Sequence, residues 1–179
     1  MTEEQFEALE MTVRRILGAS GYGLYSAPNQ GRADDLLVRE RSAGALASAA
    51  DAVGRLRGRY QEEVVPPSTA ENPFPPPEIM RRTRQLQSLQ QSLSALGSSI
   101  RAQAAPGQDA IWARIRNETA TLEQLLECDL GLVGGAEAIR DDLLTLGPQE
   151  WDDAAARRAE VDLDKLRATL RDREKLLQM

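Results

Sequence analysis

The sequence predicts an all-α protein, an elongated helical bundle or coiled coil of four to five helices. Its apolar residues recur at alternating steps of three and four, a spacing that places them on one face of a helix. Aromatic residues make up only 4% of the 179 residues, and sheets usually depend on such rings more than helix pairs do. No stretch of strand length alternates apolar with polar residues, so we expect no β-sheet.

The first predicted helix spans Thr2–Leu17, where Thr2 and Gln5 have the spacing of a capping box. A loop rich in Gly, Ser and Tyr follows at residues 18–31. We expect this loop either to remain mobile or to pack as a lid over the bundle end. The side chains available for a lid are those of Tyr22, Tyr25 and Pro28.

The second predicted helix, Arg32–Val65, carries an apolar stripe flanked by several alanines and glycines. Each glycine costs up to about 1 kcal/mol relative to alanine inside a helix. We interpret this narrow face as a surface for the close approach of another helix. The alternative is a solvated face without a partner. The candidate interface residues on this helix are Leu46, Ala50 and Val53.

Residues 66–77 contain six prolines, which exclude a helix and favour extended polyproline geometry. This linker divides the chain into an N-terminal helical segment, residues 1–65, and a C-terminal part, residues 78–179. We interpret the linker as a semi-rigid spacer between two helices. The alternative is a recognition ligand for a proline-binding domain.

The C-terminal part is predicted to hold a helical hairpin followed by a last helix. Glu78–Gln103 and Asp109–Leu146 each carry a heptad ladder of Leu, Ile and Ala. Residues 78–105 have a net charge of +3, from four arginines and one glutamate. Residues 106–150 have a net charge of -6, from nine acids and three arginines. We therefore expect these two helices to pair antiparallel, with complementary charges along their flanks.

Two features interrupt the ladder of Asp109–Leu146. Gly134 and Gly135 are adjacent, and we expect them either to kink or break the helix or to let a second backbone approach closely. Asp129 occupies a core position, where a carboxylate is costly unless it is paired. We expect Asp129 either to meet an arginine of Glu78–Gln103 or, after a small shift of register, to lie in water.

Gly147 and Pro148 end that helix, and a last helix begins near Asp152 or Asp153. Its seven acidic and seven basic residues alternate, as in a solvent-exposed coiled-coil partner. Its apolar stripe supplies the second group of candidate interface residues, Leu163, Leu166 and Leu170.

The composition excludes several classes of function. The chain has no histidine, which removes Ser-His-Asp triads and histidine metal sites, and Cys128 is its only cysteine. A net charge of -6 argues against nucleic-acid binding. No run of about 18 apolar residues is present, so we expect no membrane span. Residues 1–17 lack the pattern of a signal peptide, and we expect a cytoplasmic location.

We expect a non-enzymatic interaction or oligomerisation protein, such as an adaptor, assembly factor or chaperone-like protein, with no cofactor. Its protein partner is not identified by the sequence, but long apolar stripes predict a homo-oligomer. The alternative is an all-α enzyme or regulator that binds a metal or nucleotide on the acidic face of residues 109–146. The candidate metal ligands form two pairs with a spacing of four, Glu123 with Glu127 and Glu137 with Asp141.

Overall fold

The computed structural model describes residues 3–17, 25, 31–67, 69–70, 73–103 and 105–178. These residues form six α-helices and no strand. The helices are α1 (Glu3–Leu17), α2 (Gly31–Glu63), α3 (Pro77–Ala102), α4 (Asp109–Asn117), α5 (Thr119–Thr145) and α6 (Asp153–Gln178), with a short 3-10 helix η1 (Pro148–Glu150) before α6. The predicted all-α fold is confirmed.

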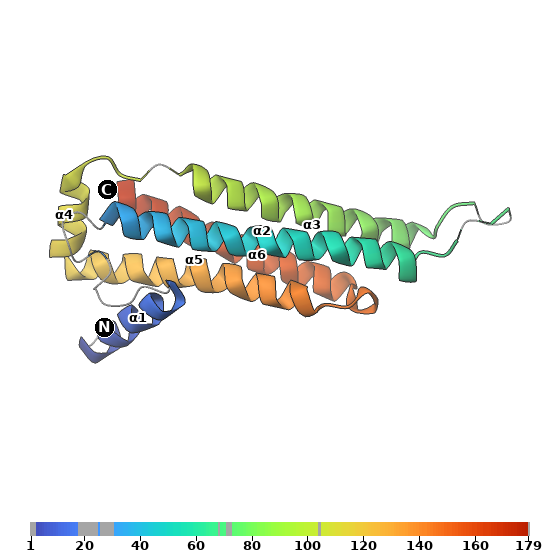
Figure 1. Cartoon of the computed structure of the whole chain (residues 1–179), viewed down its shortest axis with the longest axis horizontal. Helices are drawn as coiled ribbons and strands as arrows, with labels where there is room; N and C mark the ends of the chain where they lie inside the picture. Colours follow the sequence, from blue (N-terminus) through green and yellow to red (C-terminus); the bar gives the residue numbers. More distant parts are fainter. Residues whose placement is uncertain are drawn as a thin grey trace.

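Four long helices, α2, α3, α5 and α6, lie side by side in an elongated bundle (Figure 1). Helix α2 packs against both α3 and α5, and α6 packs against α5 and more loosely against α3. Helix α4 crosses one end of the bundle, and α1 lies against α5 near the same end (Figure 1). Two packed faces on α2 explain why its buried residues extend well beyond a single stripe.

The predicted pairing of Glu78–Gln103 with Asp109–Leu146 is wrong. Helix α3 packs mainly against α2, while α5 packs against α2 and α6. The C-terminal half does contain a helical hairpin, but α5 and α6 form it. Complementary surface charges did not identify the partner, because exposed ion pairs contribute at most about 1 kcal/mol each and apolar burial decides the packing.

The predicted break at Gly134 and Gly135 is also wrong, because α5 continues through both glycines. The long helix is instead interrupted at Glu118, whose backbone is extended with φ -106° and ψ 95°. At Gly135 a Cβ atom would lie 3.0 Å from the Cδ1 atom of Leu166 on α6. Gly135 therefore permits close approach of a second helix, which was the other expectation for this glycine pair.

The six candidate interface residues lie in the core of the single chain. Leu46, Ala50 and Val53 on α2 and Leu163, Leu166 and Leu170 on α6 are at most 6% exposed. Their contacts here lie within one chain, so a second copy could touch them only if the bundle opened. The narrow face of α2 does receive a helix, but that helix is α3, whose Gly97 faces Ala43 and Leu46.

The predicted helix ends agree closely with the structure around the proline linker. Helix α2 ends at Glu63 and α3 begins at Pro77, so the linker 66–77 falls almost entirely between two helices. Helices from both sides of this linker share one core. The predicted capping residue Thr2 and the lid residues Tyr22 and Pro28 lie outside the described residues.

We predict that Leu93→Asp abolishes cooperative unfolding. Leu93 is fully buried in α3, and a carboxylate there would lose its hydration without gaining a partner, at a cost of about 3 kcal/mol or more. The matched control is Ser94→Asp, which introduces the same charge at the neighbouring exposed position. Thermal melting followed by circular dichroism measures both variants. Equal melting curves for the two variants would contradict the packing of α3.

Candidate functional site

The candidate metal ligands do not come together in a metal site. Glu137 pairs with Arg41 at 2.7 Å and with Arg140 at 3.8 Å, while Asp141 pairs with Arg140 at 2.8 Å. The hydrogen bond from Arg140 lowers the pKa of Asp141. Glu123 is half-buried and Glu127 is exposed. Among the described residues, no group of three or more His, Cys, Asp or Glu side chains could hold a metal ion.

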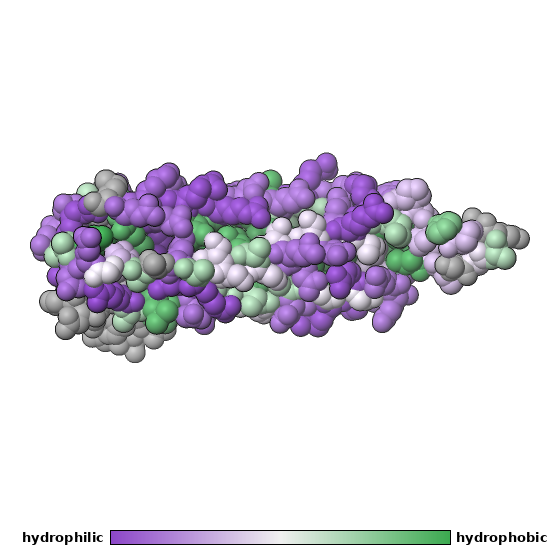
Figure 2. Space-filling model, turned by 90° about the horizontal axis from the view of Figure 1, so that it is seen from above, coloured by the Kyte–Doolittle hydropathy of each residue, from purple (hydrophilic) through white to green (hydrophobic). Residues whose placement is uncertain are grey.

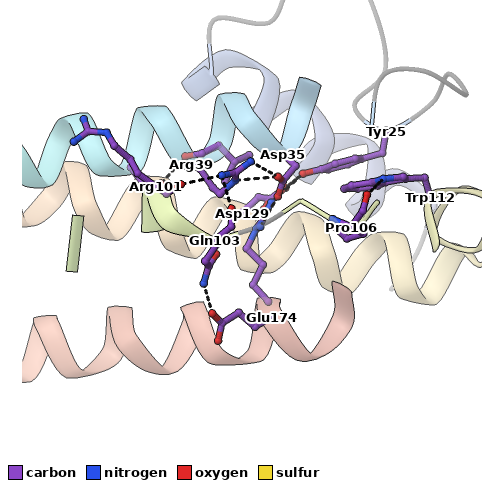
Figure 3. A network of polar contacts seen from close by, with 12 residues as sticks. Tyr25, Asp35, Arg39, Arg101, Gln103, Pro106, Trp112, Asp129 and Glu174 are labelled. Atoms are coloured by element: carbon purple, nitrogen blue, oxygen red, sulfur yellow. Dashed lines mark hydrogen bonds and ion pairs between the residues drawn. The ribbon is translucent and has the colours of Figure 1, made fainter. Parts of the chain in front are cut away.

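The most unusual polar feature is a buried ion-pair network centred on Arg173 of α6. Figure 3 shows its partners Asp35 and Asp129. The Nε atom of Arg173 donates to Asp129 of α5 at 2.6 Å, and its Nη1 atom donates to Asp35 of α2 at 2.8 Å. All three side chains are at most 1% exposed. One guanidinium group therefore joins three of the four long helices inside the core.

Arg39 extends the network toward the end of α3. Its Nε atom donates to the second carboxylate oxygen of Asp35 at 2.9 Å. Its Nη1 atom donates to the backbone carbonyls of Arg101 at 3.2 Å and Gln103 at 2.7 Å (Figure 3). These carbonyls lie at the C-terminal end of α3, where a helix leaves carbonyls without intrahelical partners and favours a cation. Arg39 thus anchors the end of α3 to α2.

Tyr25 is held at the other side of the network. Its hydroxyl group donates to Asp129 at 2.8 Å and accepts from Arg173 at 3.3 Å. Its backbone N–H donates to Asp34 at 2.7 Å. Tyr25 has a φ of 58°, a left-handed conformation that is uncommon for a bulky residue. The buried contacts of its ring, hydroxyl and backbone compensate for this strain.

Trp112 of α4 covers Tyr25 at the end of the bundle (Figure 3). The two rings stack with their centroids 5.9 Å apart and an angle of 8° between their planes. The indole N–H of Trp112 donates to the carbonyl of Pro106 at 3.0 Å. Gly31 allows the indole to approach, because a Cβ atom there would lie only 2.5 Å from the Trp112 ring. Tyr25 therefore packs at the bundle end, the place expected for the lid.

Burial and pairing shift the pKa values of Asp129 and Arg173 in opposite directions. Burial raises the pKa of Asp129, although Arg173 and the Tyr25 hydroxyl counteract this effect. Burial acts to lower the pKa of Arg173, but the negative charge of Asp129 and the other network partners raises it well above its usual range. Burial and the neighbouring Asp129 raise the pKa of Tyr25 well above its usual range.

The geometry of this network supports a structural role. Each carboxylate of Asp35 and Asp129 accepts hydrogen bonds on both of its oxygens, so neither is a free base. A cavity of about 400 Å³ adjoins the network and is partly lined by Asp35 and Arg173. Rigid pairing of this kind fixes the relative register of helices, which is the best-attested use of buried polar groups.

The prediction that Asp129 occupies a core position is confirmed, but its expected partner is wrong. Asp129 pairs with Arg173 of α6 and not with an arginine of α3. Arg39 and Arg173 were missed, although each lies on an apolar ladder, Arg39 seven residues before Leu46 and Arg173 three after Leu170. A charged residue on an apolar ladder is the signal that could have found both. Tyr25 gave no comparable signal in the sequence.

A second feature is the segment Val64–Pro76, which connects α2 to α3 and whose described residues, 64–67, 69–70 and 73–76, project from the opposite end of the bundle (Figure 1). Phe74 within it is 83% exposed, the highest value among the exposed large hydrophobic residues described. Seen from above, hydrophilic residues predominate, and hydrophobic residues appear along the bundle as well as at the end where this segment projects (Figure 2). None of the described helices combines the length and the apolar character needed to cross a membrane.

No protein-family model, curated protein or solved structure matches the chain.

We predict that Arg173→Met lowers the free energy of unfolding by about 3–5 kcal/mol, the usual effect of removing one partner of a buried ion pair. The control is Arg171→Met, two residues earlier on α6 and exposed, which we expect to change stability by less than about 0.5 kcal/mol. Urea unfolding measures both variants. Similar losses in the two variants would mean that the network does not stabilise the fold.

We further predict that the loss of unfolding free energy in Arg173→Met, relative to wild type, grows as the pH rises from about 4 toward 7. Burial already raises the pKa of Asp129, and Arg173 is the largest influence that opposes this shift. Without Arg173, the carboxylate of Asp129 binds a proton more tightly in the native state than in the unfolded state. The variant therefore keeps the stability gained from this proton at low pH and loses it as Asp129 ionises. Urea midpoints across this range test the prediction, and a deficit that shrinks with pH would contradict it.

Proposed function

We propose that this protein is a non-enzymatic helical interaction protein, an adaptor, assembly factor or chaperone-like protein, and that the segment Val64–Pro76 contacts its protein partner. The observation that supports this proposal most directly is the 83% exposure of Phe74 on a segment that projects from the bundle. Large aromatic side chains are enriched among the residues that dominate binding energy at protein interfaces.

The length of this segment argues for a role beyond connecting two helices. Helices α2 and α3 pack directly against each other, and neighbouring helices of a bundle are usually joined by about 2–8 residues. Here 13 residues separate Glu63 from Pro77. A spacer would also be expected to hold two bodies apart, whereas these helices are in contact. The interpretation as a recognition ligand therefore gains weight over that of a spacer.

The composition of the segment suits binding. Five of its residues are prolines, and three of these, Pro73, Pro75 and Pro76, surround Phe74. Proline restricts the free chain, so less conformational entropy is lost when the segment binds. Extended proline-rich segments are recognised in aromatic-lined grooves of partner domains. We propose a partner surface of this type.

The proposal includes self-association through another surface and a cytoplasmic location. The six residues first assigned to an interface between copies are buried within the chain, so self-association would need another surface. Cys128 is a free cysteine, which suits a reducing compartment.

We predict that Phe74→Ala removes a specific partner without changing the stability of the fold. Loss of an aromatic side chain that is a hot spot of an interface costs at least about 2 kcal/mol, roughly thirtyfold in affinity. The control is Val161→Ala, which truncates another exposed apolar side chain, 52% exposed, on α6. Quantitative capture from a lysate of the native host, followed by mass spectrometry, compares wild type and both variants.

The expected result is a protein retained by wild type and Val161→Ala and lost with Phe74→Ala. The thermal midpoints of all three proteins should agree within about 2 °C, since surface substitutions usually change stability by less than about 0.5 kcal/mol. An identical set of captured proteins for all three would rule out the segment as the contact.

A further inference from the structure

Two adjoining cavities form one groove along the seam between α5 and α6. The first has a volume of about 480 Å³ and lies toward η1, and the second has a volume of about 260 Å³ and lies toward Gly131. Ile139, Asp142 and Asp162 line both cavities, so the two adjoin each other. We call this feature the α5–α6 groove; it runs from Gly131 on α5 to Leu146, which directly follows α5, and from Ala155 to Thr169 on α6.

The groove is long, narrow and mainly apolar at its floor. Leu146 lies fifteen positions after Gly131, which corresponds to about 22 Å or four helical turns at 1.5 Å per residue. The lining of the groove combines small residues with larger apolar side chains that form its floor. The small residues are Gly131, Gly135, Ala138, Ala155 and Ala159, and the larger ones include Ile139, Leu143 and Trp151.

The charges of the groove are arranged with two carboxylates at its middle. Asp142 comes from α5 and Asp162 from α6, and both lie where the two cavities join. Asp162 has an exposed partner, Lys165, at 2.8 Å. The carboxylate of Asp142 has no hydrogen-bond or ion-pair partner among the described residues. The middle of the groove is thus a favourable place for a positive charge.

The remaining charged residues lie toward the ends of the groove. Glu150 and Arg158 line the cavity near η1, and Lys165 lines the cavity near Gly131. A carboxylate oxygen of Glu150 accepts from the backbone N–H of Gly147 at 2.7 Å. Only the middle therefore combines carboxylates from both helices, and a matching ligand should carry its positive charge there.

We propose that the α5–α6 groove binds an amphipathic α-helix of a partner protein, with its apolar stripe on the floor and a lysine or arginine between Asp142 and Asp162. A helix of about four turns matches the length of the groove. Amphipathic helices commonly bind in apolar grooves through residues spaced three and four apart. This site goes beyond the proposed function, because it uses a different surface from the segment Val64–Pro76.

The probe is a synthetic helical peptide of about four turns, labelled with a dye, that carries a leucine stripe and one central lysine. A second peptide replaces this lysine with glutamate and is otherwise identical. Fluorescence anisotropy with the full-length protein measures both affinities. We expect the glutamate peptide to bind at least about tenfold more weakly, a difference of about 1.4 kcal/mol. Equal affinities, or no binding of the lysine peptide, would overturn the proposal.

Matched variants locate the bound peptide. The double variant Asp142→Asn with Asp162→Asn should bind the lysine peptide at least about tenfold more weakly than wild type does. The control, Asp51→Asn with Glu62→Gln, removes the same two charges from exposed positions on α2 and should change affinity by less than about twofold. Equal losses in both variants would show general charge attraction and overturn the site.

Ala138→Gln tests the groove without changing its charge. Ala138 is exposed and lines the groove near its middle, so the longer side chain should obstruct the peptide while leaving the thermal midpoint unchanged. Full affinity in this variant would place the peptide elsewhere and overturn the proposal. The peptide measurements do not depend on Phe74, so they and the capture experiment can fail independently.

Discussion

The architecture depends on the pairing of Arg173 with Asp129 and Asp35 in the core. Transferring each ion out of water costs several kcal/mol, a cost that only close pairing and further hydrogen bonds offset. Here α2, α5 and α6 supply these partners, and Tyr25 bridges two of them. The three helices must therefore adopt one relative position if every charge is to be paired.

This constraint matters because the apolar ladders do not define a register by themselves. Leu and Ala recur along α2, α5 and α6, and a shift of one heptad would still place apolar residues opposite one another. The same shift would separate Arg173 from both carboxylates and leave buried charges without partners. Close contacts at Gly135 with Leu166 and at Gly97 with Ala43 then set the spacing between the helices.

The sequence was informative about helices and less so about their partners. Periodicity predicted Arg32–Val65 and Glu78–Gln103, close to the observed Gly31–Glu63 and Pro77–Ala102. It identifies the apolar face of each helix but not which helix covers it, so α3 was paired wrongly. Asp129 was recognised as a core residue from its ladder position. Its partner lies 44 residues away, and no local pattern predicts a contact at that distance.

One end of the bundle holds the buried network that fixes the fold, and the other end carries the segment proposed to bind a partner. The network, with Tyr25 and Trp112, closes the end where α4 crosses the bundle, and Val64–Pro76 projects from the other (Figure 1). The proposed groove begins near the middle of α5 and extends toward the projecting segment. Because buried ions prevent α5 and α6 from sliding, the width and charge pattern of their groove are set before any ligand arrives. Preorganisation of this kind reduces the entropy lost on binding.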